Sequence, residues 1–251
     1  MFVDSHCHIY KEYYEDIESL IRLIKEKNIK LIINNGCNFS TCKEVIKLSK
    51  KYESIYFTLG LHPSENLNEI DKVVALIKEN INNNKFLGIG EIGLDYYWNK
   101  ENKEEQIKVF EQQLCLAEKF NLPVIIHSRE STKDMLDILK KYKLNGIIHC
   151  FNGSVETARE YIKMGFKLGI NGIVTFKNCK LLEVIKEVGV NNIVFETDSP
   201  YLTPNPDRGK QNNPSYVNII AKYLSENLNI SISDLEIITN NNISNLFDIT
   251  L

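Results

Sequence analysis

Several features that define common protein classes are missing from this sequence of 251 residues. Its six cysteines form no C-x-x-C pair, and a chain of this length buries a core large enough to fold without disulfides. We therefore expect reduced thiols and a cytoplasmic location. No apolar run approaches the length of a membrane span, and strand-like residues begin at Phe2, so we expect neither a membrane segment nor a secretory leader.

Blocks of like charge, internal repeats and linkers rich in proline, glycine or serine are also missing. The 30 basic and 33 acidic residues are interspersed, which argues against a broad basic face that grips long nucleic acid. Apolar residues make up 43% of the chain, as in an ordinary globular protein. These properties predict a single domain over residues 1–251 with no obligate protein partner.

What the sequence does contain is a regular alternation of short apolar runs and amphipathic stretches. Runs such as Val124-Ile125-Ile126 are typical of parallel strands buried on both faces. Ile17, Leu20, Ile21 and Ile24 have the spacing of one helix face. The predicted strands are Phe2–Asp4, Lys30–Asn34, Ile55–Leu59, Phe86–Gly90, Val124–His127, Gly146–His149, Phe166–Ile170 and Asn192–Glu196. This pattern predicts an α/β fold, a (β/α)8 barrel of the TIM type, with a doubly wound open sheet as the alternative.

The histidines share one position relative to the predicted strands. All five lie at or just after the C-terminal end of a strand: His6, His8, His62, His127 and His149. Glu91 and Asp198 follow the fourth and eighth strands in the same way. Because these strand ends converge on one face of a parallel barrel, we expect the side chains to form a site there.

The residue types of this set indicate a metal site. His6 and His8 are two positions apart, so on an extended segment both imidazoles point to the same side. Mixed imidazole and carboxylate ligands suit zinc, manganese, iron and similar divalent ions better than calcium. We therefore predict one or two divalent ions bound at this face.

A glycine-rich motif lies at the end of the fourth predicted strand. The segment from Gly88 to Gly93 fits G-x-G-x-x-G and follows a strand, as a dinucleotide-binding loop would. That loop must open directly into a helix, but helical periodicity resumes only near Lys103. We instead expect these glycines to let the backbone turn sharply so that Glu91 faces the barrel axis.

Six segments taken together resemble the TatD family of metal-dependent deoxyribonucleases, a branch of the amidohydrolase-like barrels. They cover nearly the whole chain in order: Asp4-Ser-His-Cys-His8, Gly60-Leu-His-Pro63, Gly88-Ile-Gly-Glu-Ile-Gly-Leu-Asp95, His127-Ser-Arg-Glu130, His149-Cys-Phe151 and Glu196-Thr-Asp-Ser-Pro-Tyr-Leu202. One departure lies after the eighth strand. Family members commonly have Arg-Gly-Lys-Arg-Asn-Glu-Pro there, whereas this chain has Arg208-Gly-Lys-Gln-Asn-Asn-Pro214.

The resemblance implies a role for each ligand. His6, His8 and Asp198 would hold one divalent ion, His127 and His149 a second, and Glu91 would bridge the two. It also implies that His62 contacts substrate instead of binding metal. The metals expected are Mg²⁺, Mn²⁺ or Zn²⁺.

The reaction implied is hydrolysis of DNA phosphodiester bonds by metal-activated water, with trimming of single-stranded ends. We expect Asp198 to act as general base while remaining a ligand, and Glu91 to share the catalytic work. The guanidinium groups of Arg129 and Arg208 are candidates for binding substrate phosphate. Candidates for stacking on nucleobases are Tyr96, Tyr97, Trp98 and Phe151.

Two other functions fit the same residues. The first is an amide or ester hydrolase, such as an aminoacyl-tRNA deacylase, because this barrel and metal set also serve amidohydrolases. The second is a non-enzymatic protein with a structural metal. Ligands spread over five strand ends argue against it, since structural sites are closed.

Overall fold

The computed structural model describes residues 1–251. Eight parallel strands form one sheet in which sequential neighbours pair, from β1 to β8. The strands are β1 (Phe2–Cys7), β2 (Ile29–Gly36), β3 (Ile55–Leu59), β4 (Phe86–Asp95), β5 (Val124–Arg129), β6 (Gly146–Ile148), β7 (Phe166–Ile170) and β8 (Ile193–Phe195). The sheet curls into a nearly closed barrel, which confirms the predicted fold.

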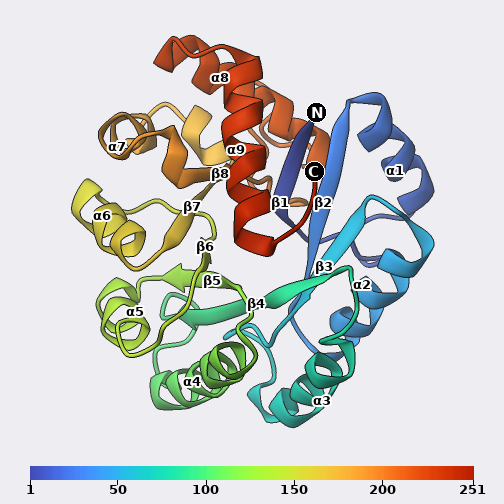
Figure 1. The fold of residues 1–251 in the computed structure, drawn as a ribbon, viewed down its shortest axis with the longest axis vertical. Coiled ribbons are helices and arrows are strands. Elements are labelled where there is room, and N and C mark those ends of the chain that lie inside the picture. Colours follow the sequence, from blue (N-terminus) through green and yellow to red (C-terminus); the bar gives the residue numbers. More distant parts are fainter.

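Eight helices surround this barrel and cover its outer face, and a ninth, α9, lies across one end of it (Figure 1). They are α1 (Ile17–Glu26), α2 (Phe39–Lys51), α3 (Ile70–Asn80), α4 (Lys103–Phe120), α5 (Thr132–Leu139), α6 (Val155–Lys163), α7 (Leu181–Val188), α8 (Val217–Leu228) and α9 (Ile232–Phe247). In α1 the predicted stripe faces the strands: Ile17, Leu20 and Ile24 are buried. None of the helices has both the length and the apolar character needed to span a bilayer.

The apolar core has two parts, one on each side of the sheet. The larger part lies between the strands and the surrounding helices. The smaller part fills the barrel interior, where Val3, Leu31 and Val194 from the strands meet Ile243 and Phe247 of α9. Because Asn242 of α9 also donates a hydrogen bond to the carbonyl of Ile193 at the start of β8, this helix closes the N-terminal end of the barrel.

The seam between β1 and β8 closes at the opposite end. Cys7 and Ser199 form the single bridge between the two segments. The His8 amide donates to the Ser199 carbonyl at 2.7 Å, and the Asp198 amide donates to the His6 carbonyl at 2.9 Å. Three predicted ligands, His6, His8 and Asp198, therefore also take part in the backbone hydrogen bonds that close the barrel.

All eight predicted strands are present, but only β3 and β7 have the predicted bounds, and the largest differences are at the C-terminal ends of β1 and β4. β1 continues to Cys7, so His6 lies within the strand. β4 continues to Asp95, so Glu91 also lies within a strand and not after it. The reason is pairing: Cys7 pairs with Asn34 of β2, and Asp95 pairs with Arg129 of β5.

The glycines of β4 have a different role from the sharp turn that we predicted. β4 keeps pairing with β5, with a register shift between Ile89 and Ile92 that includes Glu91. At Gly93, φ is +151°, and a Cβ atom would lie 1.9 Å from the His127 carbonyl oxygen. Glycine therefore allows β4 to approach β5 closely beside Glu91 and His127.

Candidate metal centre

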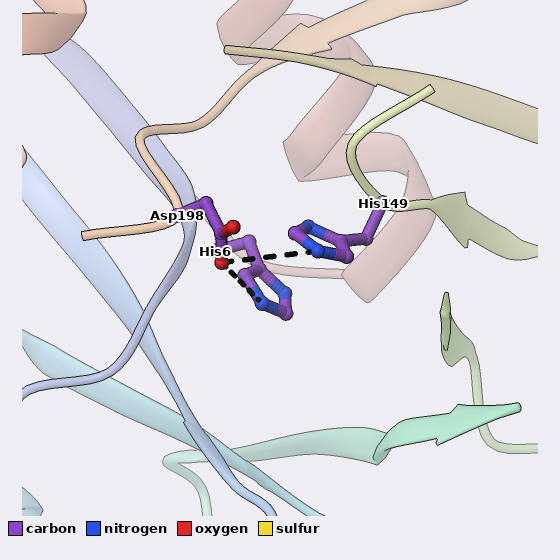
Figure 2. Close-up of side chains that lie close together, drawn as sticks. All are labelled: His6, His149 and Asp198. Carbon is purple, nitrogen blue, oxygen red and sulfur yellow. Dashed lines mark ion pairs between the residues drawn. The ribbon is translucent and has the colours of Figure 1, made fainter. Parts of the chain in front are cut away.

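The predicted ligands converge at the C-terminal mouth of the barrel. β1 supplies His6, the segment after it supplies His8, and β4 supplies Glu91. His149 directly follows β6 and Asp198 follows β8. Figure 2 shows His6 and His149 from these separate elements turned towards the Asp198 carboxylate, with His6 Nε2 at 3.6 Å and His149 Nε2 at 3.8 Å from Oδ1.

The Asp198 backbone is held in an unusual conformation. Its φ of 55° lies in the left-handed region, which non-glycine residues seldom occupy. Its amide bonds to His6, and its carbonyl accepts a hydrogen bond from the Tyr201 amide, so the surroundings fix this conformation. Strain of this kind is concentrated at functional sites and here aims a carboxylate into the cluster.

One group of ligand atoms has the spacing of a metal site. His6 Nε2 lies 3.0 Å from His8 Nε2 and 3.3 Å from Glu91 Oε2, and His8 Nε2 lies 3.4 Å from both Glu91 Oε2 and Asp198 Oδ1. Four ligand atoms arranged tetrahedrally at about 2.1 Å from an ion are about 3.4 Å apart. The side chains of His6, His8 and Glu91 therefore fit a divalent cation between them, and Asp198 Oδ1 lies beside the same two histidines.

A second group surrounds the other oxygen of Glu91. His127 Nδ1 lies 2.9 Å from Glu91 Oε1, and His62 Nε2 lies 3.5 Å from the same oxygen. His149 Nε2 lies 3.7 Å from it, between this group and Asp198. The two Glu91 oxygens thus face two different sets of imidazoles, as a bridging carboxylate would.

Two further carboxylates, Asp95 and Glu196, had no predicted role, and they contact the outer nitrogens of these histidines. Asp95 Oδ2 lies 3.1 Å from His127 Nε2, and Glu196 Oε1 lies 3.0 Å from His149 Nδ1. The contact of Asp95 is a hydrogen bond, which fixes the orientation and tautomer of His127, whereas Glu196 and His149 are paired by charge alone. Asp95 and Glu196 lie close to Glu91 and Asp198 in the sequence, but no spacing links either of them to the histidine that it contacts.

His8 is oriented by neutral groups instead. Its Nδ1 lies 3.0 Å from the Tyr10 hydroxyl, which in turn donates to the Asn35 carbonyl. Because that hydroxyl proton is used on Asn35, His8 Nδ1–H is the donor to Tyr10 and Nε2 keeps its lone pair for the cluster. The Cys37 thiol lies nearby, 3.6 Å from His8 Nδ1.

The buried carboxylates of the cluster favour positive charge at its centre. Burial would raise the pKa of Glu91, but His62, His6 and His149 hold it well below its ordinary value. Burial also works against a charged His149, yet Glu196, Asp198 and Glu91 raise its pKa to about 9. Burial lowers the pKa of His6, which favours the neutral imidazole that a metal ligand must be. The ionised carboxylates that raise the pKa of His149 favour positive charge at this position, which a divalent cation would supply in place of the imidazole proton.

The remaining predicted site residues differ in their placement. The side chain of His62 is 13% exposed and lies against the second group of ligands. The Arg129 guanidinium stacks 3.8 Å above the Tyr97 ring, and Arg208 lies 4.2 Å above the Phe176 ring. Tyr96 is only 3% exposed and its hydroxyl donates to Asp134, so little of its ring is open to a substrate.

The unusual segment after β8 is well supported despite its departure from the family pattern. Gln211, which replaces an arginine, donates from its amide to the Tyr13 carbonyl at 2.6 Å. Asn213, which replaces a glutamate, accepts from the Ser215 amide and begins the 3₁₀ turn Pro214–Tyr216. Polar contacts thus maintain the loop after the two charges have been lost.

Comparisons with known proteins identify the family of this chain. The model of a family described as TatD related DNase matches residues 3–248. The metal-dependent hydrolase YabD of Bacillus subtilis is 40% identical over 99% of this chain and 100% of its own, and YcfH of Escherichia coli is 31% identical over 98% and 96%.

Solved structures show the same fold. The TatD homologue YjjV of Escherichia coli matches with a TM-score of 0.90 at 26% identity, over 99% of this chain and 98% of its own. A TatD family hydrolase of Entamoeba histolytica matches with a TM-score of 0.86 at 24% identity, over 98% and 97%. With a family model that spans nearly the whole chain and a site of clustered histidines and carboxylates, this chain belongs to the TatD family and is a metal-dependent hydrolase.

Proposed function

We propose that this protein is a phosphodiesterase that acts on DNA and trims single-stranded ends. The observation that carries the proposal is the position of Glu91, whose two oxygens face two separate sets of imidazoles. Such an arrangement suits a pair of divalent ions bridged by one carboxylate. The family description as a DNase supports DNA as the substrate. As the cysteine pattern suggests, we expect the reaction to take place in the cytoplasm.

We keep the ligand assignment that the family resemblance implies, and the distances around Glu91 support it. His6, His8, Glu91 Oε2 and Asp198 would hold the first ion, and Glu91 Oε1 and His127 would hold the second. His149 lies on the border between the two groups and would complete the second. When bound, such ions lower the pKa of a water molecule and neutralise charge on the phosphoryl oxygens.

The protein's own side chains would orient the reaction. Asp198 is the most exposed carboxylate of the cluster, at 13%, against 4% for Glu91 and 0% for Glu196. The carboxylate is ionised, because the effect of burial is outweighed by His149 and His8, which lower its pKa. Asp198 can therefore accept a proton from water at the barrel mouth.

The phosphate would be held from outside the cluster. Neither Arg129 nor Arg208 pairs with a carboxylate; each guanidinium lies on an aromatic ring. A guanidinium in this state keeps its donors for a phosphate. The side chain of His62 is 13% exposed and lies beside Glu91, so it would contact the substrate next to the metal ligands.

The test is hydrolysis of end-labelled single-stranded and duplex DNA by the purified protein with Mg²⁺, Mn²⁺, Zn²⁺ or EDTA. We expect metal-dependent shortening of the single strand, which Glu91→Ala and Asp198→Ala abolish. Glu187→Ala, which removes a surface carboxylate paired with Arg159, is the matched control and should be fully active. Full activity in either site variant would overturn the mechanism. Absence of DNA cleavage by metal-loaded protein, together with turnover of aminoacyl-tRNA or acyl substrates, would replace the proposed reaction.

A further inference from the structure

The exposed aromatic side chains of this protein are concentrated at the barrel mouth. Large apolar side chains that are exposed are few: Met1, Tyr97, Trp98, Tyr201, Ile232 and Ile237. The three aromatic ones follow the C-terminal ends of β4 and β8, whereas the three aliphatic ones lie at the start of β1 and on α9. Exposed aromatic surface is therefore selectively placed around the candidate metal centre.

The first aromatic platform consists of Tyr97, Trp98 and Arg129. Tyr97 is 50% exposed and Trp98 69%, and Arg129 stacks on the Tyr97 ring. The platform is fastened to the site by Asp95, whose Oδ1 accepts the amides of Tyr97 and Trp98 at 2.9 and 3.1 Å. The other oxygen of Asp95 contacts His127, so one carboxylate places both the platform and a candidate ligand.

The second aromatic platform consists of Tyr201 and Tyr13. Their hydroxyls are hydrogen-bonded at 2.8 Å and their ring centroids are 5.8 Å apart. The Tyr201 ring is 49% exposed, and its centroid lies 6.4 Å from that of His8. Gln211 holds the Tyr13 backbone, so this platform also has a fixed position beside a candidate ligand.

The two platforms lie on opposite sides of the mouth. Strand order runs continuously from β1 to β8, so the β8–β1 seam faces β4 and β5 across the barrel, as Figure 1 shows. Tyr201 and Tyr13 belong to the seam, and Trp98 and Arg129 to the β4–β5 side. Glu91 and the histidines lie between them.

We propose that the two platforms bind the nucleobases on the two sides of the scissile phosphate of a single DNA strand. The inference rests on the proposed function and specifies how that substrate is held. Aromatic rings stack on any base, and they require bases that are unpaired. Arg129 adds a positive charge at the first platform, which suits the adjoining phosphate. A duplex keeps its bases stacked on each other, so the arrangement favours single-stranded ends.

The first test uses Trp98, the single tryptophan of the chain, as an intrinsic probe. Metal-loaded protein is mixed with a single-stranded oligodeoxynucleotide in a stopped-flow fluorimeter, and emission is followed before turnover. We expect saturable quenching with the normal oligonucleotide and none with an abasic oligonucleotide of equal length and charge. Equal quenching by both, or no quenching by either, would overturn a base-binding role for this platform.

The second test compares Trp98→Ala and Tyr201→Ala, with Ile237→Ala on the far helix α9 as the matched control. Each aromatic variant should raise KM for the oligonucleotide about 5-fold to 150-fold, the range known for the loss of one stacked base. Substrates with an abasic site on the 5′ or the 3′ side of the scissile phosphate assign the platforms. In each variant, an abasic site on one side of the scissile phosphate should no longer raise KM, whereas an abasic site on the other side still should. The side that loses its effect should differ between the two variants.

The outcomes separate this inference from the function on which it rests. Normal DNA cleavage with unchanged KM in both aromatic variants, or loss of sensitivity on the same side in both, would overturn the two platforms and leave the nuclease intact. Base-dependent quenching without any DNA cleavage would support the first platform and refute the nuclease. Ile237→Ala should match the wild type throughout.

Discussion

Replacement of Asp95 by asparagine tests whether the carboxylate contacts behind the histidines matter for metal binding. Asp95 is 2% exposed, and its Oδ2 contacts His127 Nε2 at 3.1 Å. This contact places the ring proton on Nε2 and leaves the Nδ1 lone pair facing Glu91 Oε1. Asparagine keeps the oxygen that binds the Tyr97 amide, but it turns an amide N–H towards Nε2. The imidazole then places its proton on Nδ1, and the lone pair that faces the metal site is lost.

The expected size of the effect follows from the bond that is lost. A charge-assisted hydrogen bond of this kind contributes about 1.5–3 kcal/mol, which corresponds to roughly 10-fold to 150-fold in metal affinity. Calorimetric titration of the metal-free protein with Zn²⁺ or Mn²⁺ should show that weakening in one class of site, with the other class unchanged. The control is Asp16→Asn, which removes an exposed carboxylate while keeping a good cap for α1. Wild-type affinity in Asp95→Asn would refute the idea that this carboxylate sets the tautomer of His127.

Three further changes probe other parts of the structure. Removal of metal with EDTA should lower Tm by roughly 5–10 °C relative to protein with metal at a hundred times Kd, and an unchanged Tm would show that the cluster binds no ion in the folded state. Gly93→Ala would place a Cβ 1.9 Å from the His127 carbonyl oxygen, so calorimetry should detect a lower metal stoichiometry or affinity, and wild-type binding would contradict the close approach of β4 and β5. Ile243→Ala, which truncates a side chain that is 1% exposed where α9 closes the barrel, should lower the free energy of unfolding by about 2–5 kcal/mol in urea titrations. Metal affinity should stay constant in that variant, and its loss would show that α9 supports the site directly.

The arrangement of the strands could be predicted from the sequence because parallel strands buried on both faces leave a plain signal. Runs such as Val124-Ile125-Ile126 have no polar residue to obscure them, and β3 and β7 have the predicted bounds. The largest errors occurred where strands contain polar residues. Glu91 and His6 interrupt the apolar pattern, so β4 and β1 seemed to end early, although their backbone pairing continues.

The same physics explains which site residues the sequence could reveal. Histidines at strand ends are conspicuous, and the structure brings all five to the mouth of the barrel. Asp95 and Glu196 remained without a role because a carboxylate that contacts the outer nitrogen of an imidazole has no fixed spacing from it in sequence: Asp95 lies 32 residues from His127 and Glu196 lies 46 or 47 from the residues it contacts after β6. Tyr96 was placed among the substrate contacts by its neighbours in sequence, but its ring turns into the core while Tyr97 and Trp98 point outwards.

The closure of the barrel by α9 determines how any molecule can reach the metal centre. The barrel interior below the ligands is filled by Val3, Leu31 and Ile243. The site is therefore open to solvent only at the C-terminal end of the barrel. A polymeric substrate cannot pass through the barrel. It must enter the site at the barrel mouth and leave by the same opening. Substrate and product therefore share one opening, and under the proposed function each cleaved nucleotide would have to leave before the shortened strand could move forward.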